Sequence, residues 1–323
     1  MHTVYGVGIR KGGQGKSTTV STLARLCALY GARVLVIDLA QPGSTSSSLR
    51  DLWPAVEHAD LANVLLACRA VSPGAILAAS QANTLLAEAE LPVTLLSQPS
   101  WSGGCIRILP WDDLLGDASA FLQSDHVLAG LIAELDREID ITIIDLPAES
   151  GSLLVTALAA TNRILIPLVP EAPSLEGVDA MLRLMARMRN AGHPLELAGI
   201  LMTRCDPKNR RVFDISQTLM QADAIEGELL SRKLLPFGVK QIDFYEQAFR
   251  YGEAIWDRTG NPSHWAAYVL LAEWLLRDAG LHHLAANRRG PALLPPDTKV
   301  LNLSALVLDD PETPLADFEH AHL

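Results

Sequence analysis

The stretch of this sequence best suited to chemistry is a run of glycines that leads into a lysine and a serine. It comprises Gly12, Gly13, Gly15, Lys16 and Ser17. Because glycine has no Cβ, such a run lets several backbone N–H groups converge on phosphate oxygens. The Lys16 ammonium can then reach β- and γ-phosphates, and the Ser17 hydroxyl can ligate Mg²⁺. We interpret the run as the phosphate cradle of a nucleotide site.

The neighbouring segments place this cradle between a strand and a helix. An apolar run at 4–9 precedes it and a helical pattern at 16–30 follows it, which is the order found in phosphate-binding loops. The strict P-loop pattern has glycine where this chain has Arg10. A second lysine, Lys11, stands at the front of the loop instead. The loop therefore departs from the ordinary P-loop pattern, and Lys11 restricts the classes of nucleotide-binding protein to which this chain can belong.

Two aspartates stand at the ends of apolar, β-branched runs. Asp38 ends Val-Leu-Val-Ile-Asp, and Asp145 ends Thr-Ile-Ile-Asp. Ligands of a doubly wound sheet bind beyond the carboxyl ends of its strands, so we expect both carboxylates beside the loop. Asp145 is a candidate for holding Mg²⁺ through a water, and Asp38 for the metal or the attacking water. The alternative is that each aspartate only caps the helix that follows it.

The rest of the chain alternates apolar runs with helical patterns. Strands are predicted at 4–9, 34–37, 141–144, 164–169, 197–202 and 229–235, and helices at 16–30, 127–138, 153–160, 175–191, 212–222 and 263–279. Such alternation implies crossover units that return each strand parallel to the last. We predict an α/β fold: a doubly wound, mostly parallel sheet with helices on both faces.

The pattern predicts one domain over residues 1–284 and a proline-containing tail over 285–323. Residues 54–125 are less regular than the rest of the domain. They contain an Ala/Leu-rich helical segment at 61–89 and a predicted strand at 106–109. We interpret them as an elaboration on the same sheet rather than a separate domain.

Composition limits the partners. The chain has 323 residues, of which 49% are hydrophobic, and a formal net charge of −11. This charge argues against a protein surface that binds DNA over its whole extent, and against a broad basic surface that binds membranes. Contact with DNA would therefore need a local basic patch. No apolar run reaches the length of a membrane span and no signal-peptide pattern precedes the first strand, which predicts a cytoplasmic protein. The four cysteines are scattered, a pattern typical of reduced thiols.

Together these motifs resemble those of the ParA/MinD family of partition and positioning ATPases, and the ParA type most closely. The resemblance rests on the deviant Walker A loop at 11–18, on 34–38, 143–147 and 165–177, on Asp206 and on the stretch around Pro236. It implies ATP and Mg²⁺ as cofactors. It also implies phosphate contacts from Gly12, Gly13, Gln14, Gly15, Lys16, Ser17 and Thr18, and metal ligation by Ser17, Asp38 and Asp145.

The resemblance gives Lys11 a role between subunits. In this family two ATP-bound subunits face each other, and the front lysine crosses to the partner's phosphates, where it offsets concentrated negative charge. This implies an ATP-dependent homodimer that loosens on hydrolysis. The implied catalytic residues are Lys11, Lys16, Asp38 and Gln41. The alternative for Lys11 is a solvent-exposed loop lysine.

One departure from the family concerns the loop after Asp38. The family usually has a second aspartate where this chain has Ala40, and proline and glutamine are swapped to give Gln41-Pro42. Alanine can neither accept a proton nor orient water. We therefore predict slow intrinsic hydrolysis, with Gln41 as a substitute group that positions water.

The resemblance also implies base and DNA contacts. Base contacts are expected from Arg204, Asp206 and Pro236, although Arg204 and Asp206 could instead pair on the surface. ParA-like members bind DNA without sequence preference. The cations that could do so here are Lys208, Arg210, Arg211, Arg232, Lys233 and Lys240. Acidic residues interleave with them, so a solvated face of mixed charge is the alternative.

These implications predict a ParA-type ATPase that works with an adaptor of ParB type. It would segregate plasmid or chromosome DNA or position another large cargo, and would associate with the nucleoid if it binds DNA. One alternative is a MinD-like ATPase on membranes, which the acidic end of the apolar run 300–308 disfavours. Another is a P-loop ATPase regulator unrelated to partition.

Overall fold

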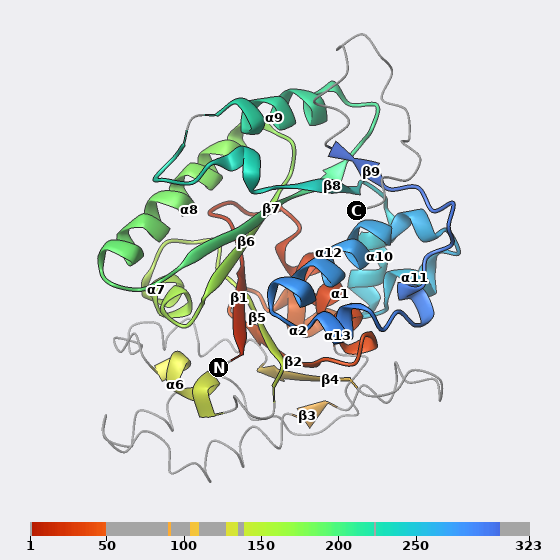
Figure 1. The fold of residues 1–323 in the computed structure, drawn as a ribbon, viewed down its shortest axis with the longest axis horizontal. Coiled ribbons are helices and arrows are strands. Elements are labelled where there is room, and N and C mark those ends of the chain that lie inside the picture. The colour runs from red at the N-terminus through yellow and green to blue at the C-terminus, as the bar shows by residue number, and fades with distance from the viewer. Residues whose placement is uncertain are drawn as a thin grey trace.

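The computed structural model describes residues 2–49, 90–91, 104–109, 127–134, 139–222 and 224–303. They form a nine-stranded sheet with the order β3-β4-β2-β5-β1-β6-β7-β8-β9 (Figure 1). Every inner pair of strands is parallel and the pair at each edge is antiparallel. The strands are β1 (Thr3–Val7), β2 (Arg33–Asp38), β3 (Glu90–Leu91), β4 (Cys105–Leu109), β5 (Ile141–Asp145), β6 (Arg163–Leu168), β7 (Glu196–Cys205), β8 (Leu234–Lys240) and β9 (Leu301–Asn302). The predicted fold class is confirmed.

Helices cover both faces of this sheet (Figure 1). One face carries α6 (Val127–Glu134), α7 (Ser152–Ala159), α8 (Ala172–Asn190) and α9 (Arg210–Gln221). The other carries α1 (Lys16–Leu29), α10 (Phe244–Tyr251), α11 (Ile255–Arg258), α12 (Ala266–Asp278) and α13 (His282–Ala285). Side chains alternate between the two cores, as a strand requires: Leu35 and Ile37 lie in the core on the side of α6–α9, whereas Val34 and Val36 lie in the core with α1.

The last long strand begins later than the sequence pattern predicts. Leu230–Arg232 form a 3₁₀ turn rather than part of a strand. The backbone N–H of Ile200 donates to the Lys233 carbonyl at 2.7 Å, so the contact with β7 starts only there. The side chains that alternate into the core come after this point, at Leu235, Phe237 and Val239. The prediction of a strand at 229–235 was wrong for its first half.

Short strands close both edges of the sheet. β3 pairs with β4, which places this part of the region 54–125 on the main sheet, whereas the helical segment predicted at 61–89 lies outside the described residues. At the other edge, Leu301 of β9 pairs with Gly238, and the Trp265 indole donates to the Pro291 carbonyl at 3.0 Å. Residues 285–303 therefore pack on the sheet and its helices. Among the described helices, none is long and apolar enough to cross a bilayer.

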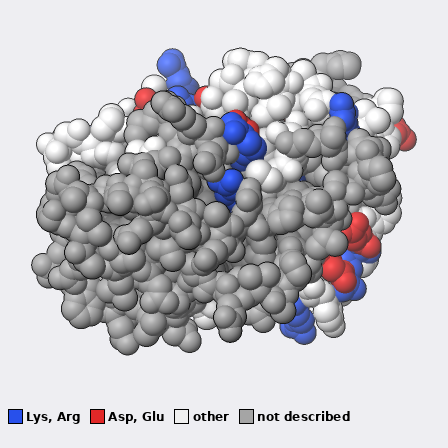
Figure 2. All heavy atoms as spheres, turned by 90° about the horizontal axis from the view of Figure 1, so that it is seen from below, with Lys and Arg blue, Asp and Glu red and all other residues white. Residues whose placement is uncertain are grey.

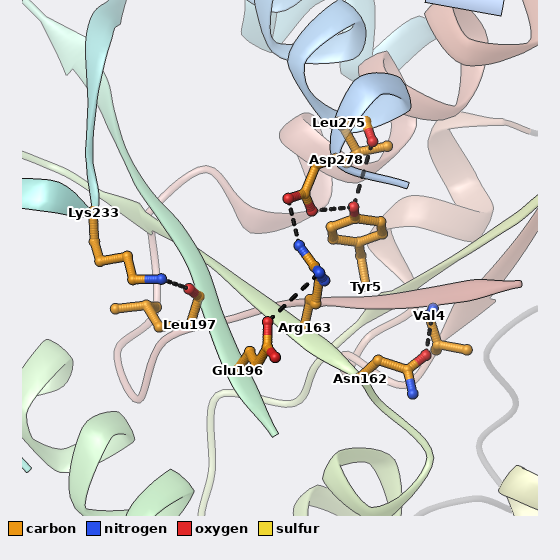
Figure 3. A network of polar contacts seen from close by, with 9 residues as sticks. All are labelled: Val4, Tyr5, Asn162, Arg163, Glu196, Leu197, Lys233, Leu275 and Asp278. Atoms are coloured by element: carbon orange, nitrogen blue, oxygen red, sulfur yellow. Dashed lines mark hydrogen bonds and ion pairs between the residues drawn. The ribbon is translucent and has the colours of Figure 1, made fainter. Parts of the chain in front are cut away.

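A polar network beside the start of β6 ties the sheet to α12 (Figure 3). The fully buried Tyr5 donates its hydroxyl to Asp278 and lies 3.4 Å from the Leu275 carbonyl. Arg163 pairs with Asp278 and lies 3.6 Å from Glu196. Burial and the Asp278 carboxylate raise the pKa of Tyr5 far above its usual value. The hydroxyl therefore stays a donor, and Asp278 joins two elements distant in sequence.

We expect Asp278→Ala to lower the free energy of unfolding by about 1–3 kcal/mol, because the Tyr5 hydroxyl and the Arg163 guanidinium lose their acceptor. Urea denaturation measures this change. Glu196→Ala is the matched control, since Glu196 is 67% exposed and its ion pair should contribute less than about 1 kcal/mol. A loss no larger than that of the control would contradict this role for Asp278.

Candidate nucleotide site at the carboxyl edge of the sheet

The glycine run forms an open loop between β1 and α1. Gly13 and Gly15 have φ values of 74° and 78°, a left-handed conformation that favours glycine. A Cβ at Gly12 or Gly13 would meet nothing within 4 Å, so this part of the loop faces open space. Helix α1 begins at Lys16 directly behind the loop, and its free N–H groups point toward it. The loop therefore has the shape and the dipole of an anion cradle.

Gln14 fixes the loop to two strand ends. Its side-chain carbonyl accepts from the Val169 N–H at 2.9 Å, and its backbone carbonyl accepts from the Thr203 hydroxyl at 3.0 Å. The Gln14 side chain is almost fully buried. The sequence placed Gln14 among phosphate-binding residues but gave no sign of these partners, which come from the ends of β6 and β7.

Lys16 lies buried at the start of α1. Burial lowers the pKa of its ammonium, and the nearby Asp145 opposes that shift. A buried cation beside a single carboxylate gains more from additional negative charge than an exposed one, because water does not screen it. This environment suits an anionic ligand in the loop.

Asp145 and Asp38 are direct neighbours, because β5 and β2 pair them in register. Asp145 is fully buried and accepts from the Thr45 hydroxyl at 2.7 Å through Oδ2. Its Oδ1 is buried and has no hydrogen-bond partner among the described residues. Burial and the charge of Asp38 raise the pKa of Asp145 to about 7, while the hydroxyls of Ser17 and Thr45 and the Lys16 ammonium lower it. An orphaned buried oxygen of this kind fits a cation or its water shell.

Asp38 has a different environment. Its Oδ2 accepts from both the N–H and the hydroxyl of Ser46 at 2.7 Å, and its Oδ1 accepts from the Ala40 N–H at 3.1 Å. Ser46 belongs to α2 (Ser44–Ser48), which follows the loop. Burial raises the pKa of Asp38, and these donors oppose the rise. Both carboxylate oxygens are thus engaged: Oδ2 holds the first turn of α2, and Oδ1 holds the loop before it.

The loop between Asp38 and α2 carries the departure from the family. Ala40 is buried and offers only its methyl group, while Gln41 is exposed. The Gln41–Pro42 bond is cis, and Gly43 N–H donates back to the Ala40 carbonyl at 2.8 Å. Sequence reasoning missed Thr45 and Ser46, whose hydroxyls contact the two aspartates. Their position a few residues after a strand-end aspartate was the available signal.

The residues predicted to contact a base do not all lie at the carboxyl ends of the strands, where the glycine loop is. Arg204, with a φ of 53°, and Asp206 lie exposed at and just beyond the end of β7. Asp206 accepts from the Lys208 N–H at 3.0 Å. Pro236 lies inside β8, well before its carboxyl end. Gln241, whose N–H donates to the Cys205 carbonyl at 2.9 Å, follows β8 at the edge itself.

The six candidate DNA-binding cations divide between opposite edges of the sheet. Lys208, Arg210 and Arg211 stand at the start of α9, and Lys240 ends β8, so these four are at the carboxyl edge. Arg232 and Lys233 precede β8 and lie at the amino edge. The Lys233 ammonium also donates to the Leu197 carbonyl at 2.6 Å. Arg210 lies 3.6 Å from Asp214.

Comparisons with known proteins agree with this geometry. Residues 3–196 match the AAA_31 family, described as AAA domain. The chromosome-partitioning ATPase Soj of Treponema pallidum is 26% identical over 232 residues, covering 72% of this chain and 81% of that protein. The chromosome-partitioning ATPase Soj of Thermus thermophilus is 27% identical over 270 residues, covering 82% of this chain and 91% of that protein.

A solved structure shows the same fold. The septum site-determining protein MinD from Pyrococcus horikoshii, complexed with Mg-ADP, matches with a TM-score of 0.60 at 19% identity. The match covers 87% of this chain and 99% of that chain. At this level of identity the likeness concerns the fold alone.

We expect Asp145→Asn to stabilise the protein without nucleotide or Mg²⁺, and to do so more at pH 8 than at pH 5. An unfolded aspartate titrates near 3.8 and Asp145 near 7, so the folded state holds a proton that the unfolded state loses. Stability therefore falls as pH rises from about 4 through about 7, and asparagine removes that loss. Thermal unfolding should show a gain at pH 8 of about 2–4 °C or more, roughly 1 kcal/mol.

The control is Asp206→Asn, which removes an exposed carboxylate near the same edge. It should change the melting temperature little, and equally, at both pH values. Equal effects of Asp145→Asn at pH 5 and pH 8 would show that Asp145 is already charged throughout this range.

Proposed function

This chain belongs to the AAA_31 family of AAA domains and is of the ParA/MinD type, and from that premise we propose that it binds and hydrolyses ATP with Mg²⁺. The observation that carries the proposal is the buried Oδ1 of Asp145, which has no hydrogen-bond partner among the described residues and lies near Lys16, the residue that follows the open glycine loop. An anion beside Lys16 and a cation beside Asp145 would both be favourable there, and a magnesium nucleotide supplies both. The names of the two Soj relatives support the same activity.

In this proposal the loop residues 12–15 and the start of α1 bind the β- and γ-phosphates. Lys16 binds the same phosphates, because its ammonium lies buried at the loop. Ser17 and Asp145 hold Mg²⁺, which neutralises phosphate charge when bound. Asp38 acts on the site by positioning α2, and so places Thr45 against Asp145. Arg204 and Asp206, at the carboxyl end of β7, are the residues proposed to contact the base of the nucleotide.

We propose that intrinsic hydrolysis is slow. A group that orients or deprotonates the attacking water typically contributes about 10²–10⁴-fold. Ala40 has no such group, and the oxygens of Asp38 already accept hydrogen bonds. Gln41 is exposed and can reach water only from the loop surface. The balance of these facts favours a long-lived ATP state.

Two substitutions separate binding from hydrolysis. Lys16→Ala should lose ATP binding by about 10²-fold or more, measured by calorimetry with Mg²⁺. Ala40→Asp should keep ATP binding and raise the steady-state rate of hydrolysis by about 10-fold or more. Rapid turnover by the native protein that Ala40→Asp leaves unchanged would contradict the proposed role of Ala40.

We further propose that ATP joins two copies of this chain. Lys11 stands at the front of the loop, where it can reach phosphates bound by a facing subunit, and its side chain is part-exposed. Two facing nucleotides concentrate negative charge, and one cation from each side offsets it. Loss of the γ-phosphate removes this contact, so the nucleotide state sets the assembly state.

The proposed DNA contact lies at the carboxyl edge, on the same side as the nucleotide. Lys208 and Arg211 lie there with at least part of their side chains in solvent, and Arg204 is near them in sequence. A small patch is what the net charge of −11 permits. Figure 2 views the molecule from below, the side where β1 begins and not the carboxyl edge, and there the visible described lysines and arginines stand as a few separate groups rather than one patch. Dimerisation would double the patch, and phosphate binding would grow accordingly.

Arg211→Ala should weaken ATP-dependent binding to duplex DNA by about 3–10-fold and reduce the salt slope by about one unit per cation lost. Fluorescence anisotropy at two salt concentrations measures both quantities. Arg232→Ala is the control, because this substitution removes the same charge from the amino edge of the sheet, opposite the proposed patch. An equal loss of DNA affinity in the two variants, or no loss in either, would contradict the proposed location of the DNA-binding patch.

A DNA-bound ATP dimer with slow hydrolysis needs a partner that triggers its release. We propose an adaptor of ParB type for this role, and segregation of plasmid or chromosome DNA, or of another large cargo, as the outcome. The partition function in the names of the Soj relatives supports this reading. In this reading the protein is cytoplasmic and associates with the nucleoid while ATP is bound.

A further inference from the structure

The front lysine of the loop is held by its own subunit. Lys11 Nζ lies 3.2 Å from the Ser174 hydroxyl and 3.6 Å from Glu171 Oε2. Ser174 is fully buried, whereas the side chains of Lys11 and Glu171 are 28% and 47% exposed. The ammonium is therefore directed at the first turn of α8, and its charge is balanced within the chain.

Close packing of α8 against the loop makes this contact. A Cβ at Gly177 would lie 3.0 Å from Ile9 Cγ1 and 3.5 Å from Lys11 Cβ. A Cβ there would crowd the Ile9 side chain, so glycine allows the close approach of helix and loop one turn after Ser174. The position of Glu171 and Ser174 over the ammonium thus follows from the core and not from a chance surface encounter.

We propose that Glu171 is a positioning residue for Lys11, which it holds against α8 in the single subunit. Lys11 leaves Glu171 for the partner's phosphates when two ATP-loaded subunits meet. The inference rests on the proposed ATP-dependent dimer and adds a residue that sets its threshold. The Lys11 ammonium then contacts a phosphate in place of the Glu171 carboxylate. Each subunit loses its internal ion pair between Lys11 and Glu171.

The expected size of the effect follows from exposure. A part-exposed ion pair shifts an equilibrium by up to about fivefold. A symmetric dimer breaks two such pairs, so their combined effect on dimerisation reaches up to about 25-fold. An effect of this size changes the protein concentration at which dimers form, but it does not by itself determine whether they form.

The test compares dimerisation of Glu171→Gln and the native protein with Mg-ATP, by sedimentation over a range of protein concentrations. Glu171→Gln should form dimers at about 5–25-fold lower protein concentration. Glu176→Gln is the matched control, since it removes an exposed carboxylate from the same helix. The decisive comparison uses a Lys11→Ala background, in which adding Glu171→Gln should change nothing, because the group it positions is gone.

The outcomes separate this inference from the proposed function. If the native protein dimerises with ATP and Glu171→Gln does so at the same or a higher concentration, the inference is overturned and the dimer stands. An equal gain in Glu176→Gln, or a gain that persists with Lys11→Ala, would overturn it as well, since the effect would be one of net charge. If the native protein stays monomeric with Mg-ATP at every concentration, the proposed dimer and the inference both fall.

Discussion

The pairing of Asp38 with Asp145 is the constraint on which the rest of the site depends. The register of β2 against β5 places two carboxylates side by side in the interior, which is unfavourable unless each finds donors or a cation. The start of α2 supplies donors to Asp38. Asp145 accepts from the Thr45 hydroxyl through Oδ2, and its Oδ1 has no partner among the described residues. Lys16, the glycine loop and α2 are thus arranged around one unsatisfied negative charge.

The parts of the site that could be predicted from sequence are those that depend on short-range pattern. The glycine run, Lys16 and the strand-end aspartates form a local strand–loop–helix signal, and the parallel fold follows from alternating buried runs. These features need few distant contacts to be specified. For this reason β2 and β5 were placed within a residue of their observed bounds.

The parts that could not be predicted depend on tertiary contacts. Gln14 is pinned by Val169 and Thr203, and Lys11 by Glu171, across more than 150 residues of chain in each case. The candidate DNA-binding cations were grouped because they are close in sequence. A strand such as β8 extends by about 3.3 Å per residue, so Lys233 and Lys240 stand at opposite edges of the sheet. No periodicity marks where an ammonium will point.

The contact between α1 and α12 has a consequence for the order in which the protein can be made. The helix that carries Lys16 is bonded to the carboxyl-terminal part of the chain: Thr19 lies 3.2 Å from the Tyr268 hydroxyl, and Tyr30 donates to Glu273 at 2.7 Å across 243 residues. At about 5–20 residues per second, a ribosome needs roughly 10–50 s to span that interval. During this time the loop exists without the helix that supports it. The contacts that fix α1 against α12 can therefore form only after nearly the whole described chain has been made.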